Sequence, residues 1–249
     1  MSGHSKWSTI KRKKGAADAK RGRLFSKLNR EILLAAKEGG SDPEANIRLR
    51  NAIAAAKGSN MPKDNIMRAI AKGTGEGVDG AQFVEFVYEG YGPGGVAVLV
   101  ETISDNRNRT TAEVRHAFAK FGGNLGEKGC VAWMFDRKGL FVFETDGLDM
   151  DRLEEVAIEN GAEDIREEGE MVEVICAIED YNTLREAFEQ AELESESADL
   201  AFLPQTTLDL SGKQAGSMLK LMETFEELDD VENVWSNFDM PEGEMNEDE

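Results

Sequence analysis

The sequence is poor in the residue types that build disulfides, metal sites and many active sites. It has two cysteines, Cys130 and Cys176, and two histidines, His4 and His116, among 249 residues. Both cysteines lie within apolar sequence, which is typical of buried thiols that pack as small hydrophobes. No zinc-binding spacing can be assembled from this set, so we expect no metal ion and no cofactor.

Sequence motifs of common catalytic sites are also missing. The chain has no Gly-x-Ser-x-Gly, no His-Glu-x-x-His and no P-loop, and neither histidine has a nucleophile at a recognisable spacing. The glycine-rich segment 92–95 precedes a predicted strand rather than a helix, so it is interpreted as a tight turn. The many carboxylates are interpreted as solvated surface. We therefore predict no catalytic residues and no enzymatic activity.

Long apolar runs are absent too. No segment approaches the roughly 18 residues of a membrane span, and residues 1–6 lack the apolar core of a secretory signal. A cytoplasmic protein without a membrane partner is expected. With 40% hydrophobic and 31% charged residues, the chain has the composition of a soluble globular protein, long enough for two or three small domains.

Positive charge is scarce overall but concentrated at the N-terminus. The net charge is −20, yet residues 1–75 contain 17 Lys and Arg against 6 Asp and Glu. The remaining residues contain 12 basic and 43 acidic side chains. A basic N-terminal region on an acidic body indicates a polyanionic partner for that region.

The first 30 residues form a dense cationic stretch with a tryptophan inside it. Its candidate nucleic-acid-binding residues are Lys6, Trp7, Lys11, Arg12, Lys13, Lys14, Lys20, Arg21, Arg23, Lys27 and Arg30. Such a cluster binds phosphates by releasing counterions, and a tryptophan can stack on an unpaired base. A solvated basic tail and a polybasic membrane tether are the alternatives, although no lipidation motif accompanies the stretch.

A second candidate phosphate site is the loop 105–110, which joins a predicted strand to a helix. Arg107 and Arg109 lie in it, next to the backbone N–H groups of a helix N-terminus. The alternative is an ordinary loop whose arginines pair with the acidic body.

Apolar periodicity, capping residues and glycines predict an α+β protein of several domains. A flexible basic arm (1–15) precedes helices at 16–38, 43–58 and 62–73, which form a three-helix bundle over 16–75 followed by a glycine-rich linker. Strands at 83–88 and 96–103 form a hairpin. A capping box, Thr110 with Glu113, opens a helix that ends at 121, and a strand follows at 130–135. The glycine-rich exit of this helix is expected near the turn at 91–95, with the arginine loop at the opposite end of the sheet.

Residues 139–203 have the β-α-β-β-α-β order of a ferredoxin-like domain. A strand (206–210), a helix (213–228) and a strand (231–238) follow, and we expect them to rejoin the earlier segment. The middle α+β domain then consists of residues 80–138 and 204–238, with the ferredoxin-like domain inserted between them. The acidic segment 239–249 is expected to be disordered.

Several motifs make the chain resemble the YebC/PmpR family from residue 3 to about residue 240. They are Gly3–Trp7, Asp18–Gly22, Leu24–Lys27, Asn60–Pro62, Glu89–Gly95, Asp105–Thr110 and Trp133–Phe135. The resemblance implies a helical N-terminal domain, a middle α+β domain and an inserted ferredoxin-like domain. It also implies a regulator of gene expression: bacterial members are generally labelled DNA-binding transcriptional regulators, others resemble ribosome-associated factors, and a mitochondrial relative activates translation.

Two nucleic-acid targets stay open at this point, duplex DNA and ribosomal or messenger RNA. The predicted bundle shows no clear basic face for a major-groove recognition helix, whereas a basic arm with one tryptophan suits folded RNA. RNA, with the ribosome as a candidate partner, is therefore slightly favoured. A protein-binding adaptor that uses the acidic surface is the alternative from another class.

Overall fold

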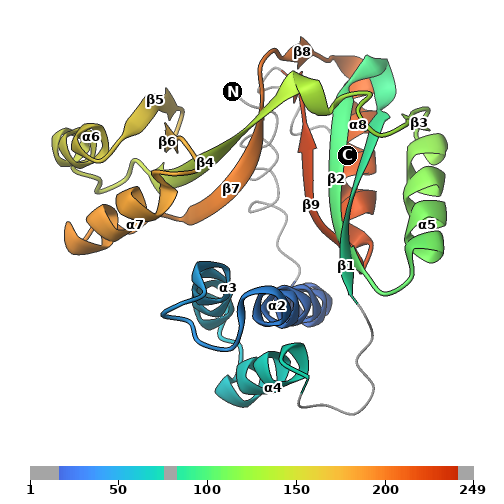
Figure 1. Cartoon of the computed structure of the whole chain (residues 1–249). Helices are drawn as coiled ribbons and strands as arrows, with labels where there is room; N and C mark the ends of the chain where they lie inside the picture. The colour runs from blue at the N-terminus through green and yellow to red at the C-terminus, as the bar shows by residue number, and fades with distance from the viewer. Residues whose placement is uncertain (1–16, 76–82, 241–249) are drawn as a thin grey trace.

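The computed structural model of the chain describes residues 17–75 and 83–240, in which helices are combined with antiparallel sheets, as expected of an α+β protein. Figure 1 shows three lobes, here called the helical lobe (17–75), the central lobe (83–134 with 205–240) and the third lobe (135–204). The predicted arm (1–15), the linker beyond Gly75 and the tail beyond Met240 lie outside the described residues. In the described ranges, no helix combines the length and apolar character needed to cross a membrane.

The helical lobe packs α2 (Ala17–Gly39), α3 (Ile47–Gly58) and α4 (Lys63–Gly73) around its own apolar core. Ile32, Leu49 and Ile66 are buried in it together with several alanines. The small alanine side chains let the helices approach one another closely, which is typical of a compact bundle.

Helix α3 begins at Ile47 and not at residue 43, where the sequence predicted its start. The reason is the side chain of Asn46, which accepts a hydrogen bond from the backbone N–H of Leu49 (3.0 Å) and donates one to the carbonyl oxygen of Ala35 (2.8 Å). This buried cap fixes the first turn of α3 and ties it to α2.

The central lobe is a four-stranded sheet in the order β3-β1-β2-β9. Its strands are β1 (Val84–Tyr91), β2 (Ala97–Ser104), β3 (Asn124–Leu125) and β9 (Val231–Ser236). The predicted hairpin is confirmed, because β1 and β2 pair antiparallel across a turn in which Gly94 and Gly95 have positive φ. Tyr91 pairs with Asn124, which confirms that the glycine-rich exit lies beside this turn.

Helices α5 (Arg107–Lys120) and α8 (Gly212–Glu227) cover one face of this sheet (Figure 1). Phe118 and Phe225 meet edge-to-face between the two helices, with ring centroids 4.9 Å apart. Every residue of β2 except Glu101 is buried, because the opposite face of the sheet is covered as well.

The structure corrects several predicted boundaries of the central lobe. Helix α5 starts at Arg107, since the side chain of Asn106 caps it and the Thr110 hydroxyl is engaged inside the protein. The segment 130–135 is not a strand, because residues 132–134 form a short 3-10 turn. Strand β8 (Leu208–Asp209) does not join the main sheet but pairs in parallel with β10 (Phe238–Asp239), and Met240 is buried, so the first two residues of the predicted tail belong to the central lobe.

The third lobe follows the element order that the sequence predicted. It consists of β4 (Phe135–Glu144), α6 (Met150–Glu159), β5 (Ala162–Glu168), β6 (Met171–Cys176), α7 (Tyr181–Gln190) and β7 (Ser197–Pro204). The strand order is β5-β6-β4-β7, that of a ferredoxin-like unit. Strand β4 starts at Phe135, where it pairs with Pro204, four residues before the predicted start of the insertion.

A shared apolar core joins the third lobe to the central lobe. Leu99 and Trp235 from the central sheet pack in it with Leu140, Ala201 and Leu203 from the third lobe. Cys176 is buried as predicted, whereas Cys130 is only half-buried at the edge of this core. The helical lobe contributes no buried residue to this core, and polar groups attach it to the other lobes.

Candidate nucleic-acid interface

Helix α2 presents three of its described cations to the acidic end of α8. Arg23, Lys27 and Arg30 are spaced four and three residues apart, which places them on one face of the helix. This face meets the C-terminus of α8 and the loop into β9, a segment that we call the acidic corner. Its acids are Glu226, Glu227, Asp229, Asp230 and Glu232.

Each of the three cations contacts the acidic corner. Arg23 Nη1 lies 3.8 Å from a carboxylate oxygen of Glu227, and Lys27 Nζ donates to the carbonyl oxygen of Glu226 at 3.3 Å. Arg30 donates to the carbonyl oxygen of Asp229, and its Nε lies 3.5 Å from Glu232. Carbonyl oxygens at a helix C-terminus carry partial negative charge, so this end of α8 favours cations.

Asp230 is the centre of the acidic corner. Its Oδ2 accepts hydrogen bonds from Ser104 (3.0 Å), Thr110 (2.7 Å) and Arg109 (2.7 Å), while Arg30 Nη1 lies 4.0 Å from its Oδ1. One buried carboxylate therefore connects α2, the end of β2 and the first turn of α5. Burial raises the pKa of Asp230, but the hydrogen bonds from Arg109, Thr110 and Ser104 outweigh it and hold that pKa below its usual range.

The neighbouring Glu232 has the opposite shift. Burial raises the pKa of Glu232 to about 7, although the charges of Arg30 and Lys27 act to lower it. This carboxyl thus titrates close to neutrality at the junction of the helical and central lobes.

Arg107 and Arg109 occupy different surroundings in the first turn of α5. The guanidinium of Arg107 lies 5.0 Å from the ring centroid of Phe86, and the side chain is exposed. Arg109 donates to Asp230 and also to Asp105, at 3.0 Å. The sequence left open whether these arginines pair with acids of the chain. The structure shows that Arg109 does and that, among the described residues, Arg107 does not.

The structure brings only part of the predicted binding set together. The cations that contact the acidic corner are Arg23, Lys27, Arg30 and Arg109. Arg107 lies two residues before Arg109 on α5. Lys6, Trp7, Lys11, Arg12, Lys13 and Lys14 lie outside the described residues. Lys20 and Arg21 belong to α2, but their side chains are not described.

Some carboxylates differ from the predicted solvated surface. Asp230 is 4% exposed and Glu89 is also 4% exposed. Glu89 accepts backbone hydrogen bonds from Gly129 (2.6 Å), Val131 (2.9 Å) and Ala132 (2.8 Å), which shape the loop between β3 and β4. Both carboxylates are buried because they have enough donors to replace water.

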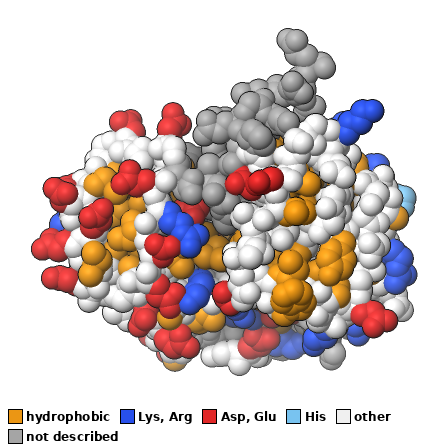
Figure 2. Space-filling view, turned by 90° about the horizontal axis from the view of Figure 1, so that it is seen from above, with side chains coloured by type: hydrophobic (Ala, Val, Ile, Leu, Met, Phe, Trp, Pro, Cys, Tyr) orange, Lys and Arg blue, Asp and Glu red, His pale blue; other side chains and the backbone are white. Residues whose placement is uncertain are grey.

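The exposed cations of α5 beyond Arg109 are not among the residues predicted to bind nucleic acid. Arg115 and Lys120 are exposed, as is Lys128 in the following loop. Figure 2 shows acidic side chains over the third lobe, whereas Lys and Arg side chains lie along the opposite edge, where α5 lies. The signal was present in the sequence, since α5 has four Lys and Arg but only one acid, Glu113.

The fold and this junction define a three-lobed α+β protein whose cationic N-terminal helix is docked on an acidic body. Residues 5–76 match the TACO1/YebC protein N-terminal domain, and residues 83–238 match the TACO1/YebC second and third domain. The chain belongs to the TACO1/YebC family, which confirms the resemblance seen in its motifs.

Relatives of similar length share most of the sequence. A "Probable transcriptional regulatory protein" of Desulfatibacillum aliphaticivorans is 57% identical over 100% of both chains. One of Geotalea uraniireducens is 59% identical over 98% of both chains. The crystal structure of a conserved hypothetical protein from Aquifex aeolicus superposes with a TM-score of 0.84 at 47% identity, covering 90% of this chain and 93% of that one. The chain is thus similar to proteins named as probable transcriptional regulators.

Proposed function

We propose that this protein is a non-enzymatic, nucleic-acid-binding regulator of gene expression that binds its target through the basic N-terminal region. The observation that carries the proposal is the division of charge, with 17 basic and 6 acidic residues in 1–75 against 12 and 43 in the remainder. Binding of the acidic remainder to a polyanion is electrostatically unfavourable, so contact is confined to the basic regions. The names of the relatives support a role in gene regulation.

Two target polymers are candidates. A transcriptional regulator would bind a DNA site, and a ribosome-associated translation factor would bind structured RNA. The described helices favour RNA slightly, because Arg48 in the first turn of α3 is already engaged. Arg48 forms ion pairs with Glu31 (2.8 Å), Glu38 (2.7 Å) and Glu85, so it is not available to read bases in a major groove. Trp7 adds to this preference, because stacking on tryptophan requires an unpaired base.

The proposed contact residues are those predicted from the sequence, divided by their surroundings. Residues 6–14 and Lys20 and Arg21 supply the primary phosphate contacts, and Arg107 adds an exposed one. Arg23, Lys27, Arg30 and Arg109 contact phosphate at most with part of their donors, since carboxylates or, for Lys27, a backbone carbonyl oxygen of the same chain already contact them.

We also propose a division of the chain into an arm (1–15), a helical domain (16–75), a middle domain and an inserted ferredoxin-like domain. The predicted insertion, 139–203, is widened to 135–204 because β4 and β7 pair from Phe135 to Pro204. The middle domain is narrowed correspondingly to residues 80–134 and 205–238.

Matched titrations of an RNA hairpin and a DNA duplex test the proposed function. Replacing Lys11, Arg12, Lys13 and Lys14 with alanine should lower the slope of log affinity against log salt by roughly 3 to 4 on duplex DNA and by about a quarter less on single-stranded RNA. Trp7→Ala should weaken hairpin binding by about five-fold to a hundred-fold and barely affect the duplex.

Each outcome separates the candidate functions. Equal losses on both polymers after Trp7→Ala would remove the preference for RNA, and sequence-selective duplex binding that survives it would favour transcription. A protein that binds neither polymer, yet retains a protein partner after deletion of residues 1–15, would be an adaptor instead.

A further inference from the structure

The acidic part of the chain has one local excess of positive charge. Residues 76–249 contain 12 Lys and Arg, and five of these fall within residues 107–128, where the acids are only Glu113 and Glu127. The five are Arg107, Arg109, Arg115, Lys120 and Lys128. This excess is located on α5 and the loop that follows it.

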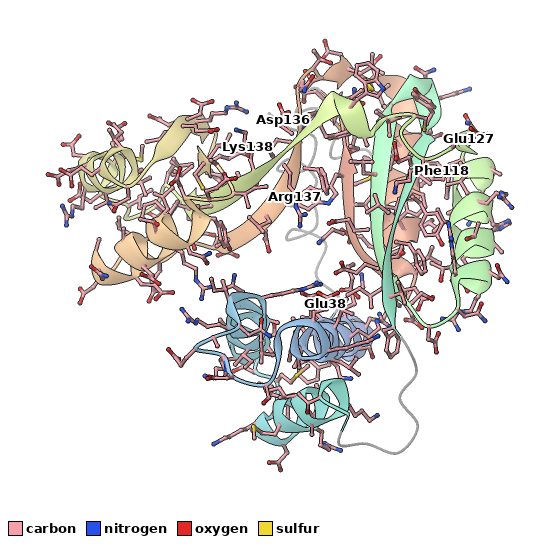
Figure 3. The ribbon with its side chains drawn as sticks, viewed as in Figure 1. Glu38, Phe118, Glu127, Asp136, Arg137 and Lys138 are labelled. Carbon is pink, nitrogen blue, oxygen red and sulfur yellow. The ribbon has the colours of Figure 1, made fainter. Side chains whose placement is uncertain are left out.

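The fold directs most of these cations away from the protein. Helix α5 packs on the central sheet through Val114, Ala117 and Phe118, all buried, and Figure 3 shows Phe118 between α5 and the sheet. Arg115 and Lys120 are exposed on the outer side, together with His116. The remaining outer positions include Ala112 and Ala119, whose small side chains leave the surface open.

These outer cations form no ion pair within the described residues, although the charge of Lys128 acts on the buried carboxylate of Glu89. In the described part of the chain, no ion pair is formed by Arg115, Lys120 or Lys128, whereas Arg23 and Arg30 are bound by the acidic corner. Lys120 is exposed, and its Nζ lies 5.0 Å from the ring centroid of Phe121. Among the described residues, Arg115 and Lys120 of α5 are therefore not paired with an acid, in contrast to Arg109 in the first turn of the helix.

The length of α5 matches an extended polyanion better than a single anion. Its 14 residues span about 20 Å, equivalent to roughly six phosphates along one strand. Arg109, in its first turn, meets the same carboxylate as Arg30 of α2, so the α5 surface begins where the helix of the basic N-terminal region is docked.

We propose that the outer face of α5, with Arg115, Lys120 and Lys128, is a second contact surface for the phosphate backbone of a nucleic acid. The inference rests on the proposed function, because the same polymer would be bound by the N-terminal region. Lys and Arg separated by alanines contact phosphates without reading sequence, so this surface adds affinity and orients the polymer.

The test measures binding of a labelled RNA hairpin to the full chain as a function of salt. The double variant Arg115→Gln with Lys120→Gln should lower the slope of log affinity against log salt by roughly 1.4 to 1.8, and the affinity at about 0.1 M salt by roughly twenty-fold or more. Its matched control is Arg152→Gln with Arg166→Gln, which removes the same charge from exposed positions of the third lobe. The control should leave the slope unchanged.

A gain of charge on the same face supplies the complementary measurement. Ala119→Lys should raise the slope by roughly 0.7 to 0.9 and tighten binding. The α5 surface would be overturned if the α5 variant and the control lowered the slope equally. It would also be overturned if neither variant changed the slope, a result that would favour an acidic protein as the partner of this face. A wild-type chain that binds neither the hairpin nor a duplex would overturn the proposed function itself. If only the alanine variants of residues 11–14 lost affinity, and the α5 variant did not, the α5 surface alone would be overturned.

Discussion

Asp230 and Glu232 are carboxylates of one short segment, yet their pKa values shift in opposite directions. Asp230 is buried but accepts hydrogen bonds from three side chains, so its charged form is favoured. Its contribution to stability is present above its ordinary pKa and is lost as pH falls through the lowered value. Glu232 is buried with a single long contact to Arg30, so desolvation dominates and its neutral form is favoured.

We expect Glu232→Gln to stabilise the protein at neutral and alkaline pH but not in acid. Because the pKa is raised from 4.5 to about 7, the contribution of the protonated carboxyl is fully present below pH 4.5 and is lost as pH rises through about 7. The variant should melt roughly 2–6 °C higher than the wild type at about pH 8 and equally at about pH 4. Thermal melts at both pH values check this, with the exposed Glu227→Gln as control. A lower melting temperature at the higher pH would show that the ion pair with Arg30 outweighs desolvation.

At the scale of elements, α2 and α8 are held together by Lys and Arg side chains of α2. These contact carboxylates and backbone carbonyl oxygens at the C-terminal end of α8 and in the loop after it. Ion pairs between partly exposed groups contribute little each and are screened by salt. Arg30 is the exception, because its side chain is 11% exposed and contacts Asp229, Asp230 and Glu232 together. The docking of the helical lobe should therefore depend on this arginine more than on Arg23.

Arg30→Gln is expected to loosen the junction between the helical and central lobes. Amide hydrogen exchange in residues 228–232 should accelerate roughly ten-fold, equivalent to about 1.4 kcal/mol of lost local stability. Exchange followed by mass spectrometry measures this, and Arg68→Gln on the exposed side of α4 is the matched control. Unchanged exchange at 228–232 would mean that other contacts hold the loop.

At the scale of the whole molecule, the three lobes are joined by two kinds of contact. The central and third lobes share an apolar core, whereas the apolar core of the helical lobe consists only of residues from its own helices. Apolar contacts are not screened by salt as ion pairs are, so these two lobes should unfold together while the helical lobe responds separately.

Leu99→Ala should destabilise both the central and the third lobe. Leu99 is fully buried in the core that they share, and such a truncation costs about 2–5 kcal/mol. Leu49→Ala, at an equally buried position of the helical lobe, is the matched comparison and should affect that lobe alone. Hydrogen exchange resolved by segment distinguishes the two. If Leu99→Ala left residues 135–204 unchanged, the shared core would not couple the lobes.

Much of the fold followed from local signals in the sequence. Helix ends at Gly39, Gly58 and Gly73, the hairpin around Gly94, and the element order of the third lobe depend on glycines and on apolar periodicity within short windows. Predictions failed where a distant partner determined the local structure. Thr110 was predicted as a cap, but its hydroxyl bonds to Asp230, 120 residues away, and Asn106 caps the helix instead.

The sequence by itself determined that the N-terminal region is basic, that the body is acidic and that the family is TACO1/YebC, because composition and motifs require no three-dimensional information. Only the tertiary structure decided which cations are neutralised within the chain. Arg30 pairs with Glu232, 202 residues away, whereas Arg115 forms no ion pair within the described residues although Glu113 lies two positions from it in the sequence. The physical reason is that ion pairing falls off within a few ångströms, so it depends on how helices and loops pack and not on the charge of the neighbouring sequence.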